Sequence, residues 1–403
     1  MQRKLNIAMV AACPFSAAQG SQVYIQQMSE ALVKRGHRVH LICYHFGEHH
    51  QKFNFEINRI PRITSYYRFR AGPSFQKPLL DFMLFLKLWQ VVKKEAIDII
   101  HAHNYEAPLA GLLVKRLTGI PVIFNSHNVL SDELYTYFRL KFSKRLAKSL
   151  AHYLDTYIPK KADFCITVSQ EAVSFFKAKG VAPDRIRFIP PGIDYHNTKA
   201  CTPRAVREKY DLRAQPLIIY TGNLDGYQNI ELLFHSIKRV SKSLAEFTVV
   251  MVTNSDYNKY KKLAKEIGID RYILFFYSLT FNQTQEILAI ADIAVSPRTS
   301  WSGFPIKLLN YMAAGKAIVA SEGSAKGIEH LHNGLVIKNG DSEGFAHAIL
   351  QLIKDPELVK KLGRNARKTV LHYRWKQITQ EIEEVYEKVL HLPHPLKKCP
   401  ELK

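Results

Sequence analysis

Residues 302–321, SGFPIKLLNYMAAGKAIVAS, combine a loop, a helix and the start of a strand. Gly303 leaves room for close approach of the backbone, Pro305 suits the first turn of a helix, and Gly315 is placed to end that helix. Free N–H groups and the positive end of the helix dipole would point out of this loop, which makes it a candidate phosphate site. The helix also carries an apolar stripe typical of a core helix, at Leu308, Leu309 and Met312.

Four other loops carry polar residues where a buried strand is expected to end. In an open parallel sheet, ligands bind beyond the carboxyl ends of the strands. Each signal is weak alone, because a single glycine before a helix is usually a plain turn and no GxGxxG spacing is present. The loops contain Gly20 and Ser21, the HAHN run that ends at Asn104, the SHN run around His127, and the TGN run with Gly222 and Asn223.

Three histidines in two of these loops leave two interpretations open. His101, His103 and His127 could converge on a metal ion, although spacing in the sequence cannot establish convergence. Alternatively, His101 and His103 are hydrogen-bonded side chains at the end of a strand.

Alternating strands and helices must position these loops. Residues 5–12, 37–45, 96–104, 120–128, 163–168 and 186–194 read as strands separated by helices, and the pattern restarts with six strand candidates between residues 216 and 339. This alternation predicts two consecutive doubly wound parallel sheets of the Rossmann-like α/β class. We place the domains at 1–195 and 196–375, with a polar hinge near 190–203 and a C-terminal helix and tail at 376–403.

Composition limits the classes of partner and compartment. The chain has 403 residues, 47% of them hydrophobic, and a net charge of +22, which predicts two full cores and an anionic partner. Its five cysteines form no CxxC pair, so we expect a reducing compartment, with the cytoplasm as the default. No signal-peptide layout and no apolar run of about 18 residues is apparent, so we expect a soluble or peripheral protein.

Taken together, these stretches resemble the GT-B glycosyltransferases of family 4 over nearly the whole chain. The resemblance rests on GSQVYIQQMSEALVKRGHRV, IDIIHAHN, VIFNSHN, ADFCITVSQEAV, IPPGID, IYTGNLDGYQNIELL, ADIAVSPRTSWSGFPIKLLNYMAAGKAIVAS and NGLVIKNGD. It implies two Rossmann-like domains facing a cleft, the first for the acceptor and the second for a nucleotide-sugar donor. It also implies retention of configuration, no metal or other cofactor, and a last helix that crosses back to the first domain; the chain contains no D-x-D motif.

The chain departs from the family pattern at four positions. The family usually has Glu-x7-Glu across residues 302–310, where this chain has Ser302 and Asn310, and Arg and Lys in the first loop of the second domain, where it has Asn223 and Gln228. Two lost positive charges should weaken diphosphate binding, since each charge-assisted hydrogen bond contributes roughly 1.5–3 kcal/mol. The nearest basic residues that could compensate are Lys307 and Arg298.

The resemblance also assigns roles to the remaining loops. It places His127 near the transferred sugar and Ser302 at the position of the first glutamate, so these two are the catalytic candidates. Asn310 can still hydrogen-bond a ribose hydroxyl. Backbone dipoles for the departing diphosphate would come from Gly20, Ser21, Gly303 and Phe304.

Two basic segments suggest where an acceptor or a surface binds. Residues 51–94 contain nine Lys or Arg against two acids, and residues 135–161 contain seven against Asp155 alone, with aromatic and aliphatic residues between the charges. Such segments bind anionic bilayers or are solvated faces, and both interpretations stay open. Nucleic acid is excluded as a partner for lack of any recognition motif.

From these features we expect a retaining glycosyltransferase that moves a hexose from a nucleotide sugar to a lipid or lipid-linked envelope glycan. We place this transfer at the cytoplasmic face of the membrane. The alternatives are a soluble or polysaccharide acceptor, or a catalytically silent sugar-binding scaffold.

Overall fold

The computed structural model describes residues 3–15, 20–47, 52–62, 72, 74–138, 140–194 and 202–391. The chain forms two compact units, which we describe separately. The first contains Met1–Gly192, Ser302–Phe304 and Trp375–Lys403, and the second contains Ile193–Trp301 and Pro305–Arg374. Half of the predicted hinge, residues 195–201, lies outside the described residues. None of the helices described is both long enough and apolar enough to cross a membrane.

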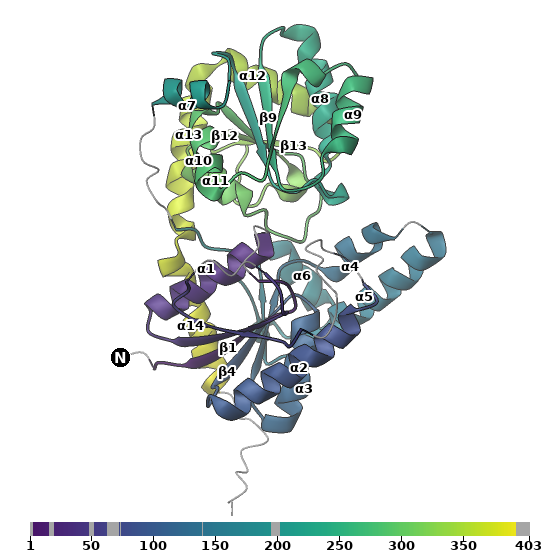
Figure 1. The fold of residues 1–403 in the computed structure, drawn as a ribbon, viewed down its shortest axis with the longest axis vertical. Coiled ribbons are helices and arrows are strands. Elements are labelled where there is room, and N and C mark those ends of the chain that lie inside the picture. The colour runs from purple at the N-terminus through teal and green to yellow at the C-terminus, as the bar shows by residue number, and fades with distance from the viewer. Residues whose placement is uncertain are drawn as a thin grey trace, which may run out of the picture. The chain divides into compact units, whose positions relative to one another are not determined.

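The first unit is built on a seven-stranded sheet in the order β3-β2-β1-β4-β5-β6-β7, in which all neighbouring strands are parallel (Figure 1). Strand order reverses between β1 and β4, where open α/β sheets bind ligands. The strands are β1 (Asn6–Ala11), β2 (Arg38–Cys43), β3 (Glu56–Arg59), β4 (Ile99–His103), β5 (Val122–Ser126), β6 (Phe164–Thr167) and β7 (Ile186–Phe188). The helices are α1 (Gly20–Lys34), α2 (Lys77–Lys94), α3 (Glu106–Thr118), α4 (Leu130–Glu133), α5 (Lys141–Lys161), α6 (Gln170–Ala178) and α14 (Trp375–His391).

The second unit has a six-stranded parallel sheet in the order β10-β9-β8-β11-β12-β13. Its strands are β8 (Leu217–Thr221), β9 (Thr248–Thr253), β10 (Ile273–Tyr277), β11 (Ile293–Ser296), β12 (Ala317–Ser321) and β13 (Leu335–Ile337). Its helices are α7 (Pro203–Lys209), α8 (Ile230–Ser243), α9 (Asn258–Glu266), α10 (Phe281–Ile290), α11 (Lys307–Ala313), α12 (Ser342–Lys354) and α13 (Pro356–Thr369). The six strands predicted in this half are all present, and the α/β class with two parallel sheets is confirmed.

Both cores follow from burial of the sheets on two faces. Strands β4, β5 and β9 are buried at every residue, because helices cover both sides of a doubly wound parallel sheet. In the second unit, the residues of α8 and α12 pack with those of β8 and β9 in one cluster that includes Phe234, Ile237, Phe345 and Ile349.

The last helix belongs to the first unit, where α14 packs against α1. Its Glu383 is 2% exposed and forms ion pairs with Arg35, at 2.6 Å, and with His37, at 2.9 Å. Burial tends to raise the pKa of this carboxyl, but the hydrogen bonds from Arg35 and His37 outweigh burial and hold the pKa below its usual value. Glu383 is therefore an ionised anchor between the amino-terminal and carboxy-terminal segments of one unit.

Trp375, the first residue of α14, packs the start of this helix against residues of the segment Met1–Gly192. Its side chain is 3% exposed, donates from Nε1 to Gln27 at 3.2 Å and stacks on Tyr24. A Cβ added at Gly192 would lie 2.4 Å from Cδ2 of the Trp375 ring.

Replacing Gly192 with Ala should therefore displace the Trp375 ring and lower the free energy of unfolding by about 1–3 kcal/mol, the usual cost of overpacking. Urea unfolding followed by tryptophan fluorescence measures this change. Gly226→Ala is the matched control, because a Cβ at Gly226 meets nothing within 4 Å. Equal stability of the two variants would show that the ring does not need this space.

Candidate functional site

The predicted polar loops of the first unit lie at the carboxyl edge of its sheet. Gly20 and Ser21 are exposed and begin α1. Asn104 directly follows β4 with a left-handed φ of 61°, and its N–H donates to the carbonyl of Asn125 at 3.1 Å. His127 directly follows β5. Because β1, β4 and β5 are neighbours in the sheet, the structure brings these loops together at one edge.

A network of buried rings holds His127. Its Nε2 lies 2.9 Å from Nδ1 of His103, and the ring centroid lies 4.9 Å from that of Tyr24. His101 uses both ring nitrogens, Nδ1 with the Tyr386 hydroxyl at 2.7 Å and Nε2 with the Asn125 amide at 3.0 Å. The metal-triad interpretation is therefore wrong for His101, whose nitrogens have no free lone pair for an ion. The alternative, hydrogen-bonded histidines at a strand end, describes His101 and His103.

Burial keeps these rings neutral. It lowers the pKa of His127 to about 3 and, together with the charge of His127, lowers the pKa of His101 to about 3. A neutral imidazole has one donor and one acceptor, so in the contact between His127 and His103 one of the two facing nitrogens donates and the other accepts. His127 is thus arranged to hydrogen-bond a ligand rather than to carry a positive charge near neutral pH.

Ser302, Gly303 and Phe304 belong to the first unit and are buried. The Ser302 hydroxyl donates to Oδ2 of Asp132 at 2.7 Å, and the Ser302 N–H donates to the same oxygen at 3.3 Å. The hydroxyl of Ser169 donates to the Ser302 carbonyl at 3.0 Å. A carboxylate therefore contacts the position where the family pattern has its first glutamate. Asp132, which lies in α4 five residues after His127, was not among the predicted site residues.

The start of the following helix differs from the prediction. Pro305 lies before α11 rather than in its first turn, with its carbonyl accepting from the Leu308 N–H at 2.9 Å. The helix has seven residues, too short for a strong dipole, and the Ser302 N–H is already bonded to Asp132. The Ser302 N–H is therefore not free for a phosphate, while the site predicted at the N–H groups of Gly303 and Phe304 stays a prediction. The expected end is present, since Gly315 has a φ of 65°.

In the second unit, Lys307 reaches the loop after β8. Its Nζ donates to Oε1 of Gln228 at 3.1 Å, and Nε2 of Gln228 donates to Oδ1 of Asn223 at 2.9 Å. A Cβ at Gly222, whose φ is 130°, would lie 3.0 Å from that Nζ. The ammonium also sits 3.9 Å from the centre of the Tyr220 ring. The structure thus brings three predicted residues, Gly222, Asn223 and Gln228, together with Tyr220 around the ammonium of Lys307.

Arg298 supplies a second cation to this cluster. It is 8% exposed, its guanidinium lies 5.0 Å from the centre of the Tyr227 ring, and Nη2 donates to Ser300 at 3.1 Å. Its Nε is buried and has no hydrogen-bond partner. Burial and then the charge of Arg298 hold the pKa of Lys307 well below its usual value. Among the residues that the structure describes, neither cation has a carboxylate partner, which is the arrangement of an anion site.

Asn310 lies three residues after Lys307 on α11 and is half-buried. Within the described part of the chain its amide makes no hydrogen bond, so it is available to a ligand. Tyr311, which the sequence analysis did not single out, accepts from the Thr221 N–H at 2.8 Å and ties α11 to the end of β8. The spacing of apolar residues predicts strands and helices, but it does not predict a hydrogen bond between residues so far apart in the sequence.

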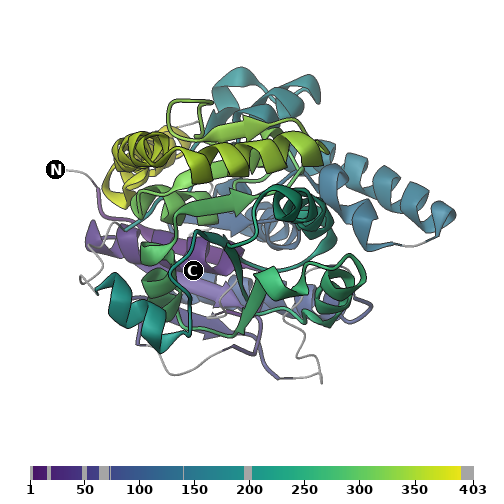
Figure 2. The same cartoon turned by 90° about the horizontal axis from the view of Figure 1, so that it is seen from above.

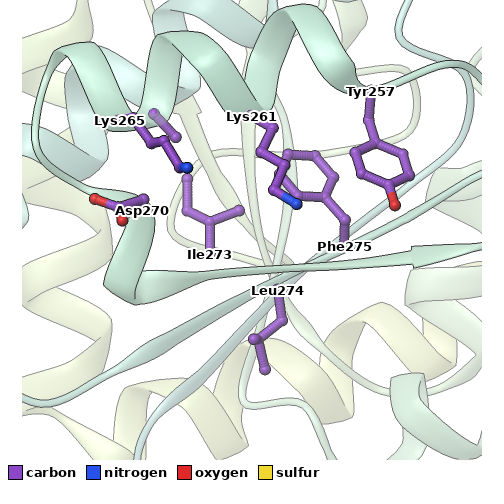
Figure 3. Close-up of a pocket in the computed structure, with 8 residues that line it drawn as sticks. Tyr257, Lys261, Lys265, Asp270, Ile273, Leu274 and Phe275 are labelled. Carbon is purple, nitrogen blue, oxygen red and sulfur yellow. The ribbon is translucent and has the colours of Figure 1, made fainter.

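Other clusters lie away from these residues. His40, Glu56 and Glu95 are the residues in the described part of the chain whose ligand atoms are close enough together for a metal ion, but Arg38 already forms ion pairs with both carboxylates. In the second unit, a pocket between α9 and β10 is lined by Lys261 and other residues shown in Figure 3. No predicted site residue lines it.

Comparison with known proteins decides the family. The model of glycosyltransferase family 4 matches residues 18–197, and that of glycosyl transferases group 1 matches residues 204–369. The chain belongs to glycosyltransferase family 4. It is a hexosyltransferase of this type, transferring a sugar from a nucleotide sugar.

Relatives extend over most of this family 4 chain. The phosphatidyl-myo-inositol mannosyltransferase of Mycolicibacterium smegmatis is 21% identical, over 96% of this chain and 94% of its own. Among solved structures, the sucrose-phosphate synthase of Thermosynechococcus elongatus has a TM-score of 0.82 at 17% identity, covering 96% of this chain and 99% of its own. HepE of Anabaena, solved with UDP-glucose, has a TM-score of 0.75 at 17% identity, covering 95% and 100%. These likenesses confirm the GT-B fold.

The neutral state of His127 makes stability depend on pH. A histidine whose folded-state pKa lies below its unfolded value contributes stability above the unfolded pKa and loses it as pH falls. With the folded pKa at about 3, the wild-type free energy of unfolding should fall between pH 6.5 and 5, and His127 should account for about 2 kcal/mol of that fall.

The variant His127→Gln should show a correspondingly shallower fall in urea unfolding at the two pH values. His152→Gln, an exposed histidine on α5, is the control and should leave the pH dependence unchanged. The same slope in wild type and His127→Gln would mean that the folded protein tolerates a charged His127.

Proposed function

We propose that this glycosyltransferase transfers a hexose, with retention of configuration, from a UDP-sugar. The single observation that carries the proposal is the pair of cations Lys307 and Arg298, neither with a carboxylate partner among the described residues, with the Lys307 ammonium beside Gly222. The similarity to HepE, solved with UDP-glucose, supports uridine as the base.

In this proposal Lys307 takes over from the arginine and lysine that the family pattern places at Asn223 and Gln228. Those two amides instead hold the ammonium in place through the bonds from Lys307 to Gln228 and from Gln228 to Asn223. Lys307 and Arg298 bind the diphosphate, and Gly222 allows it close to the backbone. Asn310 binds the ribose hydroxyls.

During transfer, the bond between the anomeric carbon and the diphosphate breaks, and the acceptor hydroxyl forms a bond to that carbon on the same face. The hydroxyl proton leaves with the phosphate, whose growing negative charge the two cations stabilise. His127 hydrogen-bonds the transferred sugar. Ser302 and Asp132 together present a hydroxyl and a carboxylate where the family has glutamate, and Gly20, Ser21 and Asn104 contribute polar contacts from the first unit.

For the acceptor we propose a lipid or a lipid-linked envelope glycan at the cytoplasmic face of the membrane. The net charge of +22 favours an anionic surface, and one relative is named a phosphatidyl-myo-inositol mannosyltransferase. A small soluble acceptor is the second candidate, favoured by the high structural similarity to a sucrose-phosphate synthase. Radiolabelled transfer from UDP-glucose to extracted lipids or to soluble sugars distinguishes the two.

Calorimetric titration with UDP, GDP and ADP tests the donor site. We expect micromolar binding of UDP, and Lys307→Met should weaken it by about tenfold or more, because one charge-assisted contact to phosphate is lost. UDP affinity should also fall as pH rises through the lowered pKa of Lys307, and this pH dependence should disappear in the variant. Lys265→Met, exposed on α9, is the control.

Preferential binding of GDP or ADP would overturn the choice of base. If none of the three binds, the cation pair is not a donor site, and the altered positions Asn223, Gln228, Ser302 and Asn310 indicate a sugar-binding scaffold.

A further inference from the structure

Helix α5 has two apolar stripes, of which the first unit buries only one. The inner stripe consists of Ala147, Ala151 and Ile158, which are buried together with Asp155. The outer stripe follows the same helical spacing on another side and is exposed. Its members are Phe142 at 80% exposed, Leu146 at 63%, Leu150 at 52%, Tyr153 at 61% and Tyr157 at 38%. Five large apolar side chains in a row on one exposed helix face are not scattered surface residues.

Positive charges flank this outer stripe. Lys141, Arg145 and Lys148 recur at intervals of four and three residues, so they form an exposed strip along the helix beside the apolar one. The helix contains one acidic residue, Asp155, and that residue is fully buried. It accepts from the Tyr105 hydroxyl. It also accepts from the N–H groups of Leu130 and Ser131, both at 3.0 Å. The exposed surface of α5 is therefore apolar and cationic, without a carboxylate to oppose it.

The position of α5 leaves this surface accessible. In Figures 1 and 2 the amino-terminal part of α5 extends away from the sheet of the first unit, at the end of the segment that follows α4. The other basic segment of the sequence analysis is different. Residues 63–71 in its middle lie outside the described residues, and α2 within it buries Leu80, Leu84 and Leu88 in the core.

We propose that the outer face of α5 docks on an anionic lipid bilayer, with the stripe from Phe142 to Tyr157 inserted among the lipid chains and the strip from Lys141 to Lys148 among the headgroups. Charge complementarity selects this occupant, because a helix with an apolar stripe and a cationic flank matches the boundary between acyl chains and anionic headgroups. This inference deepens the proposed function, on which it rests, by naming the surface that brings the enzyme to a lipid acceptor.

Sedimentation with vesicles tests the proposal on the full-length protein. The probes are vesicles of phosphatidylcholine alone and vesicles that also contain phosphatidylglycerol, at low and high salt. We expect binding to the anionic vesicles, weakened by salt because the headgroup contacts are screened. Vesicles of phosphatidylcholine alone should bind much less protein.

Two double variants separate the contribution of the apolar outer stripe from that of the cationic strip. Phe142→Ser with Leu146→Ser removes inserted side chains, and Arg145→Glu with Lys148→Glu reverses two charges. Each should reduce the partition coefficient on anionic vesicles by about tenfold or more, while UDP binding stays at the wild-type level. The matched controls carry the same changes in the second unit at exposed positions. They are Leu274→Ser with Phe281→Ser, and Lys261→Glu with Lys265→Glu.

Three results would overturn the inference. One is a wild-type protein that binds UDP but not anionic vesicles, in which case the donor site stands and the docking surface fails. The second is a loss of vesicle binding in the controls as large as in the α5 variants. The third is a wild-type dimer by light scattering that becomes a monomer in Phe142→Ser with Leu146→Ser, which would assign the stripe to a second copy of the chain. Loss of UDP binding in all proteins would instead count against the proposed function.

Discussion

The parallel register of the two sheets is the constraint on which the functional geometry depends. In a parallel sheet every strand points the same way, so each polar residue that directly follows a strand arrives at the same edge. Asn104 and His127 follow neighbouring strands of the first sheet, and Gly222 and Arg298 follow β8 and β11, which are neighbours in the second. Neighbouring strands are bonded in register, so the backbone bonds of the strands hold residues that are far apart in the sequence at one edge.

Within that frame, the two candidate sites use desolvation in opposite ways. Around His127, burial removes the charge of the histidines and leaves a set of neutral donors and acceptors with fixed orientation. Around Lys307, burial and the nearby guanidinium make the positive charge costly until an anion arrives. The first environment suits recognition of an uncharged sugar, and the second suits a ligand that brings its own negative charge.

Much of the architecture was predictable because parallel strands buried on both faces are continuous apolar runs in the sequence. Runs such as TVVMVT and AIVAS were predicted as strands for this reason. Strand β3 was not predicted, because its residues are exposed or half-buried and EINR has no such pattern. The strand-end rule found His127 and Asn104, but it could not find Asp132 or the bond from Lys307 to Gln228, since those contacts join residues 170 and 79 positions apart. Long-range pairing of side chains has no local signature.

The path of the chain between the two units has a consequence for how the protein is made. The second unit is formed from Ile193–Trp301 and Pro305–Arg374, whereas the first needs α14, whose Glu383 and Trp375 complete its packing. During synthesis the second unit can therefore become compact while the earlier one still exposes the surface of α1 that α14 will cover. The first unit is therefore synthesised first but completed last. Until α14 has been synthesised, the apolar surface of α1 that it covers stays exposed to aggregation and to chaperones.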